Sequence, residues 1–336
     1  MLEHGGRLLR AASEYGIPAE DWLDLSTGIS PFAWPVPPLP PSVWQRLPED
    51  DDGLTEAARA YYGHASLLPV AGSQAAIQAL PALRARSRVG VLDPGYAEHA
   101  HAWQRAGHKV ERVDAEALFA RAARYDVIVL IHPNNPGGER FELDALLALH
   151  ATLARRGGWL VVDEAFIDAT PAHSLCAAHA LPGLIVLRSV GKFFGLAGAR
   201  AGFVCAEPAL LVALRERLGP WTLSGPARHV LKLALADTAW QATQRERLHT
   251  ASAQLSTLLA RHGLAPDAGC AFFQWLRDER APALQRALAR QGVLVRRFEQ
   301  PHSLRFGLPG DAAAFARLEA ALASLRRVET QIEVAP

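Results

Sequence analysis

The most informative segment of this chain is Ser189-Val190-Gly191-Lys192-Phe193-Phe194-Gly195-Leu196-Ala197-Gly198-Ala199-Arg200. It comes just after the apolar run Leu184–Leu187, and its glycines predict a tight turn around Lys192. A serine lies three residues before this lysine, and an arginine lies eight residues after it. A lysine that tight backbone holds beside anion-binding groups is suited to form a Schiff base with a phosphorylated aldehyde.

Three further apolar runs lie upstream of this segment, and each ends in turn residues. They are Val89–Gly95, Asp126–Pro133 and Trp159–Glu164. Segments rich in alanine and leucine lie between the runs, such as Leu143–Arg156, and these segments are predicted helices. Continuous apolar strands that alternate with helices indicate a largely parallel sheet with helices on both faces. The sequence therefore predicts an α/β fold for this part of the chain.

The pattern changes after about residue 225. The stretch Ala227–His262 predicts a single long helical segment. Three candidate strands follow it, at Ala271–Leu276, Val293–Phe298 and Ser303–Gly307. This succession of helix and strands is typical of a smaller α+β domain.

A proline-rich stretch precedes the first of these elements. Seven prolines lie between Pro31 and Pro48, which excludes a helix interior or a central strand and predicts an extended connector. We therefore predict an N-terminal arm with its connector (1–40), a large domain (41–225) with a mostly parallel mixed sheet, and a small domain (226–336).

Polar residues stand at the carboxyl ends of the predicted strands, where ligands bind in parallel α/β sheets. Tyr96 follows the first strand, Asn134 and Asn135 follow the second, and Asp163 ends the third. Upstream, Gly72-Ser73-Gln74 precedes an apolar helical pattern. That arrangement predicts a helix N-terminus able to bind phosphate through free backbone N–H groups.

Composition argues against several classes of function. The chain has 336 residues, 21% of them charged, and a formal net charge of +1, so no excess charge favours nucleic acid or an acidic membrane as a partner. The N-terminus lacks the regions of a signal peptide, and no apolar run approaches the roughly 18 residues that span a bilayer. Cys176, Cys205 and Cys270 have neither metal-ligand nor disulfide spacing, so we expect no metal and a cytoplasmic location.

Taken together, these motifs resemble those of the fold-type I pyridoxal-phosphate enzymes, in the aminotransferase class I/II branch, over nearly the whole chain. The ordered set is Gly72-Ser73-Gln74, Pro94-Gly95-Tyr96, Asn134-Asn135-Pro136, Asp163-Glu164-Ala165 and Ser189 to Arg200. The resemblance implies pyridoxal 5'-phosphate as the cofactor, bound covalently by Lys192. It also implies a large domain with a mixed, mostly parallel sheet between helices and a small α+β domain.

The same resemblance implies a role for each residue of the set. Asp163 is expected to pair with the pyridine nitrogen and keep it protonated, so that the ring accepts electrons from a carbanion. Tyr96 is expected to stack on the ring, and Asn135 to hydrogen-bond the ring hydroxyl oxygen. The cofactor phosphate is expected to be held by the turn and helix start at 72–74 and by two residues later in the chain. These residues are Gly72, Ser73, Gln74, Ser189 and Arg200.

Some of these residues have simpler structural interpretations. Tyr96 also fits ordinary core packing, and Arg200 also fits a surface cation. An acidic pair after an apolar strand, such as Asp163-Glu164, is also typical of nucleotide hydrolases. The chain has no G-x-x-x-x-G-K-[ST] loop, because Lys192 is followed by phenylalanine, and this disfavours the hydrolase.

Two families within the branch resemble the chain closely, the histidinol-phosphate aminotransferases and the threonine-phosphate decarboxylases of cobalamin biosynthesis. Three features favour the second family: the opening His4-Gly5-Gly6, Phe166 where aminotransferases usually carry tyrosine, and the run Leu23–Pro31. The resemblance then implies decarboxylation of L-threonine O-3-phosphate to 1-aminopropan-2-yl phosphate and carbon dioxide. The alternatives are an aminotransferase of the histidinol-phosphate type and a non-catalytic ligand sensor, which the intact Lys192 disfavours.

The chain departs from that family at several positions. Gly28 and Ser30 stand where asparagines are common, and Leu47 stands where a tyrosine usually reaches the neighbouring subunit. Asn135-Pro136-Gly137-Gly138 replaces Asn-Pro-Thr-Gly. These changes leave the cofactor prediction intact and affect the expected orientation of the substrate.

A substrate with both a phosphate and a carboxylate needs more than one cation. Arg296 and Arg305 lie on the predicted strands of the small domain, and arginine binds either anion bidentately. Together with His4-Gly5-Gly6 they form the expected substrate-binding set, although the sequence does not show which arginine binds which anion. The family resemblance also implies a homodimer.

Overall fold

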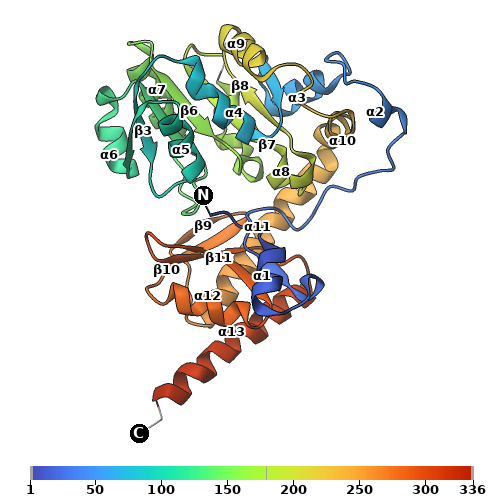
Figure 1. Ribbon diagram of the computed structural model, residues 1–336, viewed down its shortest axis with the longest axis vertical. Coiled ribbons are helices and arrows are strands. Elements are labelled where there is room, and N and C mark those ends of the chain that lie inside the picture. The colour runs from blue at the N-terminus through green and yellow to red at the C-terminus, as the bar shows by residue number, and fades with distance from the viewer. Residues whose placement is uncertain (1–2, 179, 334–336) are drawn as a thin grey trace. The chain divides into compact units, whose positions relative to one another are not determined.

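The computed structural model describes residues 3–178 and 180–333, which form two compact units (Figure 1). The large unit comprises Ala33–Asn135 and Glu139–Arg245, apart from residue 179. The small unit comprises residues 3–32, Pro136–Gly138 and residues 246–333.

Within the described residues, the large unit contains a seven-stranded sheet in the order β2-β8-β7-β6-β5-β3-β4. Its strands are β2 (Leu67–Val70), β3 (Arg88–Leu92), β4 (Lys109–Val113), β5 (Val127–Ile131), β6 (Trp159–Asp163), β7 (Leu184–Ser189) and β8 (Gly202–Cys205). Strands β3 to β7 run parallel, and β8 is antiparallel to both of its neighbours. The sheet is therefore mixed and mostly parallel, as predicted.

Helices flank this sheet. They are α2 (Ser42–Gln45), α3 (Leu54–Tyr62), α4 (Ser73–Ala79), α5 (Ala97–Arg105), α6 (Ala115–Ala120), α7 (Leu143–Ala154), α8 (Val190–Phe193), α9 (Pro208–Leu218) and α10 (Gly225–Ala236). Alternate strand residues such as Val127 and Val129 pack with α4, α5 and α9 in one buried cluster. The residues between them face the other side, where Leu118 of α6 lies against Gly90. Both faces are covered, which explains why the strands are apolar throughout.

In the small unit, the described residues form a five-stranded sheet in the order β1-β11-β12-β10-β9. Its strands are β1 (Leu23–Leu25), β9 (Ala268–Cys270), β10 (Phe273–Arg277), β11 (Val293–Phe298) and β12 (Ser303–Gly307). Only β1 and β11 pair in parallel. The helices of this unit are α1 (Leu8–Tyr15), α12 (Ala281–Ala289), α13 (Ala312–Glu333) and the part of α11 (Thr238–Arg261) from Glu246 onward.

The prediction of one helical segment over 227–262 is wrong, because the chain breaks at Asp237. This residue has non-helical angles of φ −84° and ψ 77°. Its carboxylate accepts hydrogen bonds from the Trp240 backbone N–H at 3.0 Å and from Trp34 Nε1 at 3.1 Å. Asp237 therefore caps α11 while it anchors the proline-rich connector.

The unit boundaries differ from the predicted domain boundaries. Residues 226–245 group with the large unit, because α10 packs on α3 and Arg228 donates to Asp52 at 2.7 and 2.8 Å. Residues 3–32 group with the small unit, because β1 extends its sheet. Among the residues the structure describes, no helix has the length and apolar character needed to cross a membrane.

Candidate functional site

The large unit gathers most of the predicted cofactor residues at one edge of its sheet. Strands β3, β5, β6 and β7 are parallel, so their carboxyl ends lie together. Ile131 pairs with Asp163 across β5 and β6, and Asp163 pairs with Leu187 across β6 and β7. The segments that follow these strand ends carry Tyr96, Asn135 and Lys192, as the strand pattern predicted.

Asp163 ends β6 as a buried carboxylate with two partners. Its Oδ2 lies 2.9 Å from His99 Nε2, and its Oδ1 accepts the Ala165 backbone N–H at 3.0 Å. The side chains of Asp163 and His99 are only 5% and 1% exposed. A buried carboxylate held at both oxygens has a fixed direction, which suits a group that must face one atom of a ligand.

His99 was not among the site residues predicted from the sequence. The one sequence feature that links His99 to the site is its spacing, three residues after Tyr96, which precedes α5. The rings of Tyr96 and His99 indeed meet edge to face, with centroids 6.1 Å apart. The pattern of scattered histidines gave no reason to choose this one in advance.

The start of α4 forms a tight cradle with Arg200. Gly72 has a φ of +74°, and a Cβ built there would lie 3.1 Å from Arg200 Nη2. Gly202 of β8 is equally constrained, since its Cβ would lie 2.8 Å from the Ser73 backbone nitrogen and 2.5 Å from the Arg188 carbonyl oxygen. Two glycines thus let β8 and the arginine approach the helix N-terminus closely, where an anion is favoured.

Tyr96 is linked to the start of α4 by a hydrogen bond and feels the charge of Asp163. Its hydroxyl donates to Gln74 Oε1 at 3.2 Å, and Gln74 Nε2 donates to Glu98 Oε2 at 3.0 Å. Burial, followed by the negative charges of Glu98 and Asp163, raises the pKa of Tyr96 to about 12. Tyr96 is therefore a neutral phenol at physiological pH. It also packs against the buried cluster of the sheet, so the core-packing and ring-stacking interpretations are compatible.

Lys192 lies in the short helix α8, directly after β7. Its Nζ lies 5.8 Å from the ring centroid of Phe166, a side chain only 4% exposed. A Cβ on Gly191 would lie 3.0 Å from the Ala197 Cα, so a side chain there would crowd the turn that follows Lys192. Phe193 and Phe194 are fully buried and contact Trp240. These contacts fix the backbone of Lys192, while its side chain stays half-buried.

Asn134 joins the loops that follow β3 and β5. Its Nδ2 donates to the Pro94 carbonyl at 2.9 Å and to Glu139 Oε2 at 2.8 Å. Its Oδ1 accepts the Asn135 backbone N–H at 2.8 Å. Asn134 is 1% exposed, so its task is to hold the turn and orient the half-buried Asn135.

A buried ion cluster supports the turn after β6. Arg188, which precedes Ser189 on β7, donates to Glu164 Oε2 at 2.8 Å and to Asp168 Oδ1 at 2.5 Å. Ser174 and Tyr61 donate to the same two carboxylates. The cluster connects the strand that leads to Lys192 with the segment that carries Phe166.

We expect Arg188→Ala to lower the free energy of unfolding by about 3–5 kcal/mol, because it leaves two buried carboxylates without their cation. Burial already raises the pKa of Glu164 in spite of Arg188. Urea denaturation at equal cofactor loading measures the change. The exposed Arg105 of α5 offers the control, and Arg105→Ala is expected to change stability by less than about 0.5 kcal/mol. Equal midpoints for the two variants would contradict the prediction.

The predicted substrate residues lie in the small unit. Arg296 of β11 and Arg305 of β12 are cross-strand partners, so their side chains share a face of the sheet. Arg296 Nη2 donates to the Glu3 carbonyl at 2.6 Å, and Arg305 Nη2 donates to the Ser26 carbonyl at 2.9 Å. Burial, followed by the charge of Arg296, lowers the pKa of Arg305 to about 10. The guanidinium groups remain charged at neutral pH and gain from an anionic partner.

The N-terminal arm lies against these arginines. Gly6 N–H donates to Ser26 Oγ at 2.7 Å, and a Cβ on Gly5 would lie 2.2 Å from the Ser26 carbonyl oxygen. His4 and Arg296 line a common pocket. The structure therefore brings His4, Gly5, Gly6, Arg296 and Arg305 together within the small unit.

A family model described as Aminotransferase class I and II matches residues 21–322. The chain belongs to this family. Its α/β fold, with a mixed sheet between helices and a second α+β unit, is the fold-type I architecture that the sequence predicted. Solved structures of family members support this at the level of the fold.

Two such structures illustrate the similarity. A histidinol-phosphate aminotransferase from Sinorhizobium meliloti, solved in complex with pyridoxal-5'-phosphate, is 19% identical and superposes with a TM-score of 0.80 over 98% of this chain and 99% of its own. An L-threonine-O-3-phosphate decarboxylase from Porphyromonas gingivalis is 19% identical, with a TM-score of 0.73 over 85% of this chain and 92% of its own.

Among curated family members, much higher identity is found. A threonine-phosphate decarboxylase from Pseudomonas aeruginosa is 59% identical over 322 residues, which cover 96% of this chain and 97% of that protein. A protein of the same name from Sinorhizobium sp. is 43% identical over 96% of this chain and 98% of its own.

Proposed function

We propose that this family member is a pyridoxal-phosphate-dependent decarboxylase that converts L-threonine O-3-phosphate to 1-aminopropan-2-yl phosphate and carbon dioxide, a step of cobalamin biosynthesis. The observation that carries the proposal is the 59% identity to a threonine-phosphate decarboxylase over 96% of the chain. The relatives named histidinol-phosphate aminotransferase give weaker support to the alternative. One from Sodalis glossinidius, for example, is 32% identical over only 46% of this chain.

The residues of the large unit fit pyridoxal 5'-phosphate. The cradle of Gly72, Ser73 and Arg200 suits a phosphate group, because it combines a helix N-terminus with a guanidinium. The buried Asp163 carboxylate suits a protonated pyridine nitrogen, and the neutral Tyr96 suits the ring face. Gln74, Asn135 and Ser189 complete the cofactor-binding set. When bound, the cofactor supplies an electron sink for the pair released at the substrate Cα.

Lys192 and Asp163 divide the chemical work. Lys192 Nζ would hold the cofactor covalently, and its amine, once free, would deliver a proton to the substrate Cα. Asp163 keeps its negative charge toward the pyridine nitrogen, with His99 holding Oδ2 in place. Phe166 beside Nζ limits water around the proton that Lys192 transfers.

The outcome of the reaction depends on which bond at Cα stands perpendicular to the cofactor ring. In decarboxylation the Cα–carboxylate bond breaks, its electron pair stays with Cα, and carbon dioxide leaves. We assign this orientation to the cations of the small unit, Arg296, Arg305 and His4, which bind the anionic groups of the substrate.

We also propose a homodimer that works in the cytoplasm on a small phosphorylated amino acid, without nucleic acid or membrane partners. The free thiols of Cys176, Cys205 and Cys270 suit a reducing compartment. The large unit exposes several apolar side chains, among them Trp44, Leu47 and Trp221 at 68%, 65% and 60%. Sedimentation is expected to show a dimer at micromolar concentration, and an active monomer would contradict this proposal.

One assay tests the proposed function. The purified protein is mixed with threonine phosphate, and carbon dioxide release is followed. In parallel, the protein is given glutamate and imidazole-acetol phosphate, and amino transfer is followed. We expect carbon dioxide from the first mixture and at most slow transfer in the second. Rapid amino transfer with no carbon dioxide would favour the aminotransferase.

A further inference from the structure

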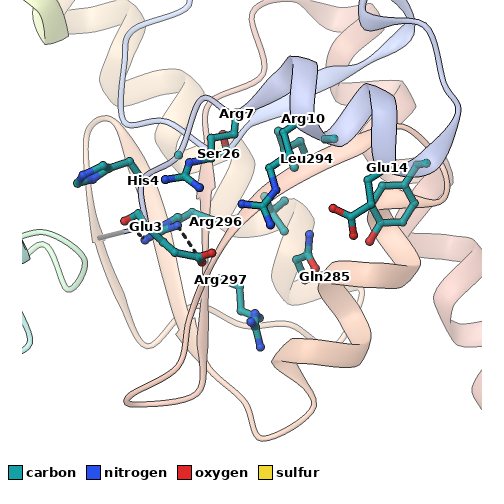
Figure 2. Close-up of a pocket in the computed structure, with 14 residues that line it drawn as sticks. Glu3, His4, Arg7, Arg10, Glu14, Ser26, Gln285, Leu294, Arg296 and Arg297 are labelled. Atoms are coloured by element: carbon teal, nitrogen blue, oxygen red, sulfur yellow. Dashed lines mark hydrogen bonds and ion pairs between the residues drawn. The ribbon is translucent and has the colours of Figure 1, made fainter. Parts of the chain in front are cut away.

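A polar pocket of about 210 Å³ lies within the small unit, lined by the N-terminal segment, α1, α12 and β11 (Figure 2). This volume is far larger than a single water molecule needs and has room for a tetrahedral anion. Among the described residues that line it, four are arginines and two are glutamates. The lining is therefore predominantly cationic.

Of the four arginines that line the pocket, only Arg296 was among the predicted substrate residues, and Arg7 is the one that directly follows His4-Gly5-Gly6. It is the residue directly before α1, and its side chain lines the pocket together with His4 and Arg296 (Figure 2). Burial lowers the pKa of Arg296, and the positive charge of Arg7 lowers it further, while Glu3 opposes both effects. Two guanidinium groups that repel each other across one pocket are relieved when an anion binds both.

The backbone on either side of Arg7 is held in place. Gly6 N–H donates to Ser26 Oγ at 2.7 Å, and Ser26 Oγ donates to Asp24 Oδ1 at 2.6 Å. On the other side, the Ala11 N–H donates a hydrogen bond to the Arg7 carbonyl at 3.1 Å, and this bond belongs to the first turn of α1. A side chain presented from a fixed backbone loses less freedom when it binds a ligand.

We propose that Arg7 is a further specificity-determining residue, which binds the phosphate group of the substrate together with His4 and Arg296. The inference rests on the proposed function, since it takes threonine phosphate as the substrate. A phosphate monoester offers three strong acceptor oxygens, and each accepts more than one hydrogen bond, so two guanidinium groups and an imidazole can donate to it together. Arg7 then distinguishes threonine phosphate from free threonine.

The test compares Arg7→Ala with Arg286→Ala, because Arg286 is an exposed arginine of the same unit that lies outside the pocket lining. Both variants lose one positive charge. We expect Arg7→Ala to raise the KM for threonine phosphate about tenfold or more, with kcat changed less than about twofold. Arg7→Lys is expected to recover only part of the loss, since lysine lacks the bidentate fork. Arg286→Ala is expected to match the wild type.

A second readout does not need turnover. Inorganic phosphate is titrated calorimetrically into the holoenzyme, and Arg7→Ala is expected to weaken its binding while Arg286→Ala leaves it unchanged. If the wild type releases no carbon dioxide but Arg7→Ala still weakens phosphate binding, the proposed function fails and phosphate recognition by Arg7 stands. If Arg7→Ala equals Arg286→Ala in KM and in phosphate binding, the inference is overturned.

Discussion

Lys192→Ala is expected to lower kcat for decarboxylation of threonine phosphate by at least about 10³-fold. In the proposed mechanism, the substitution removes both the nucleophile that holds the cofactor and the amine that delivers a proton to Cα. The fold is expected to survive, because the packing of α8 comes from Phe193 and Phe194, which are fully buried, whereas Lys192 is half-buried. The loss is therefore chemical and does not reflect unfolding.

The covalent assignment has a direct measurement, since the chain contains only three lysines, Lys109, Lys192 and Lys232. Borohydride reduction of the yellow holoenzyme, followed by mass spectrometry, is expected to place the pyridoxyl adduct on Lys192. Lys109→Ala is the control, because Lys109 is an exposed residue of β4, and it is expected to keep wild-type colour and turnover. An adduct on Lys109 or Lys232 would overturn the assignment.

The sequence predicted the elements whose signal is local. Strands β11 and β12 were predicted with their observed bounds, and β5 to β7 were predicted to within two residues at either end because each is a continuous apolar run between turn residues. The three-residue strand β1 was not predicted, since its place in the sheet depends on pairing with β11, nearly 270 residues later. The break at Asp237 was missed for the same reason, because Trp34 holds that carboxylate from far along the chain.

The candidate site divides in the same way. Lys192, Asp163 and the Gly72 turn could be proposed from the sequence because their signals are single residues next to strands or helices. The residues that support them are distant in the sequence and meet their partners only in the folded chain. His99 meets Asp163 in this way, and Arg188 meets Glu164 and Asp168. No local pattern distinguishes a buried histidine or arginine with such partners from one on the surface.

Asp163→Asn is expected to reduce kcat at least about 10²-fold while the cofactor stays bound. The amide has nearly the same shape, so its Oδ1 still accepts the Ala165 N–H. It carries no negative charge, however, and a neutral amide does not stabilise a protonated pyridine nitrogen. Ser73 and Arg200, which we propose hold the cofactor phosphate, are left unchanged.

The role of His99 gives this prediction its sharpest control. If the histidine acts by orienting the carboxylate, His99→Gln keeps a side-chain donor toward Oδ2 and is expected to lose less activity than His99→Phe. Both histidine variants are expected to retain a higher turnover than Asp163→Asn. Turnover and visible absorbance are measured for all three variants at saturating cofactor. A variant that retains the visible absorbance but loses turnover still binds the cofactor and is defective in the catalytic step. Near-native turnover in Asp163→Asn would show that the carboxylate only supports the turn after β6, and the assignment of the pyridine nitrogen to Asp163 would then fail.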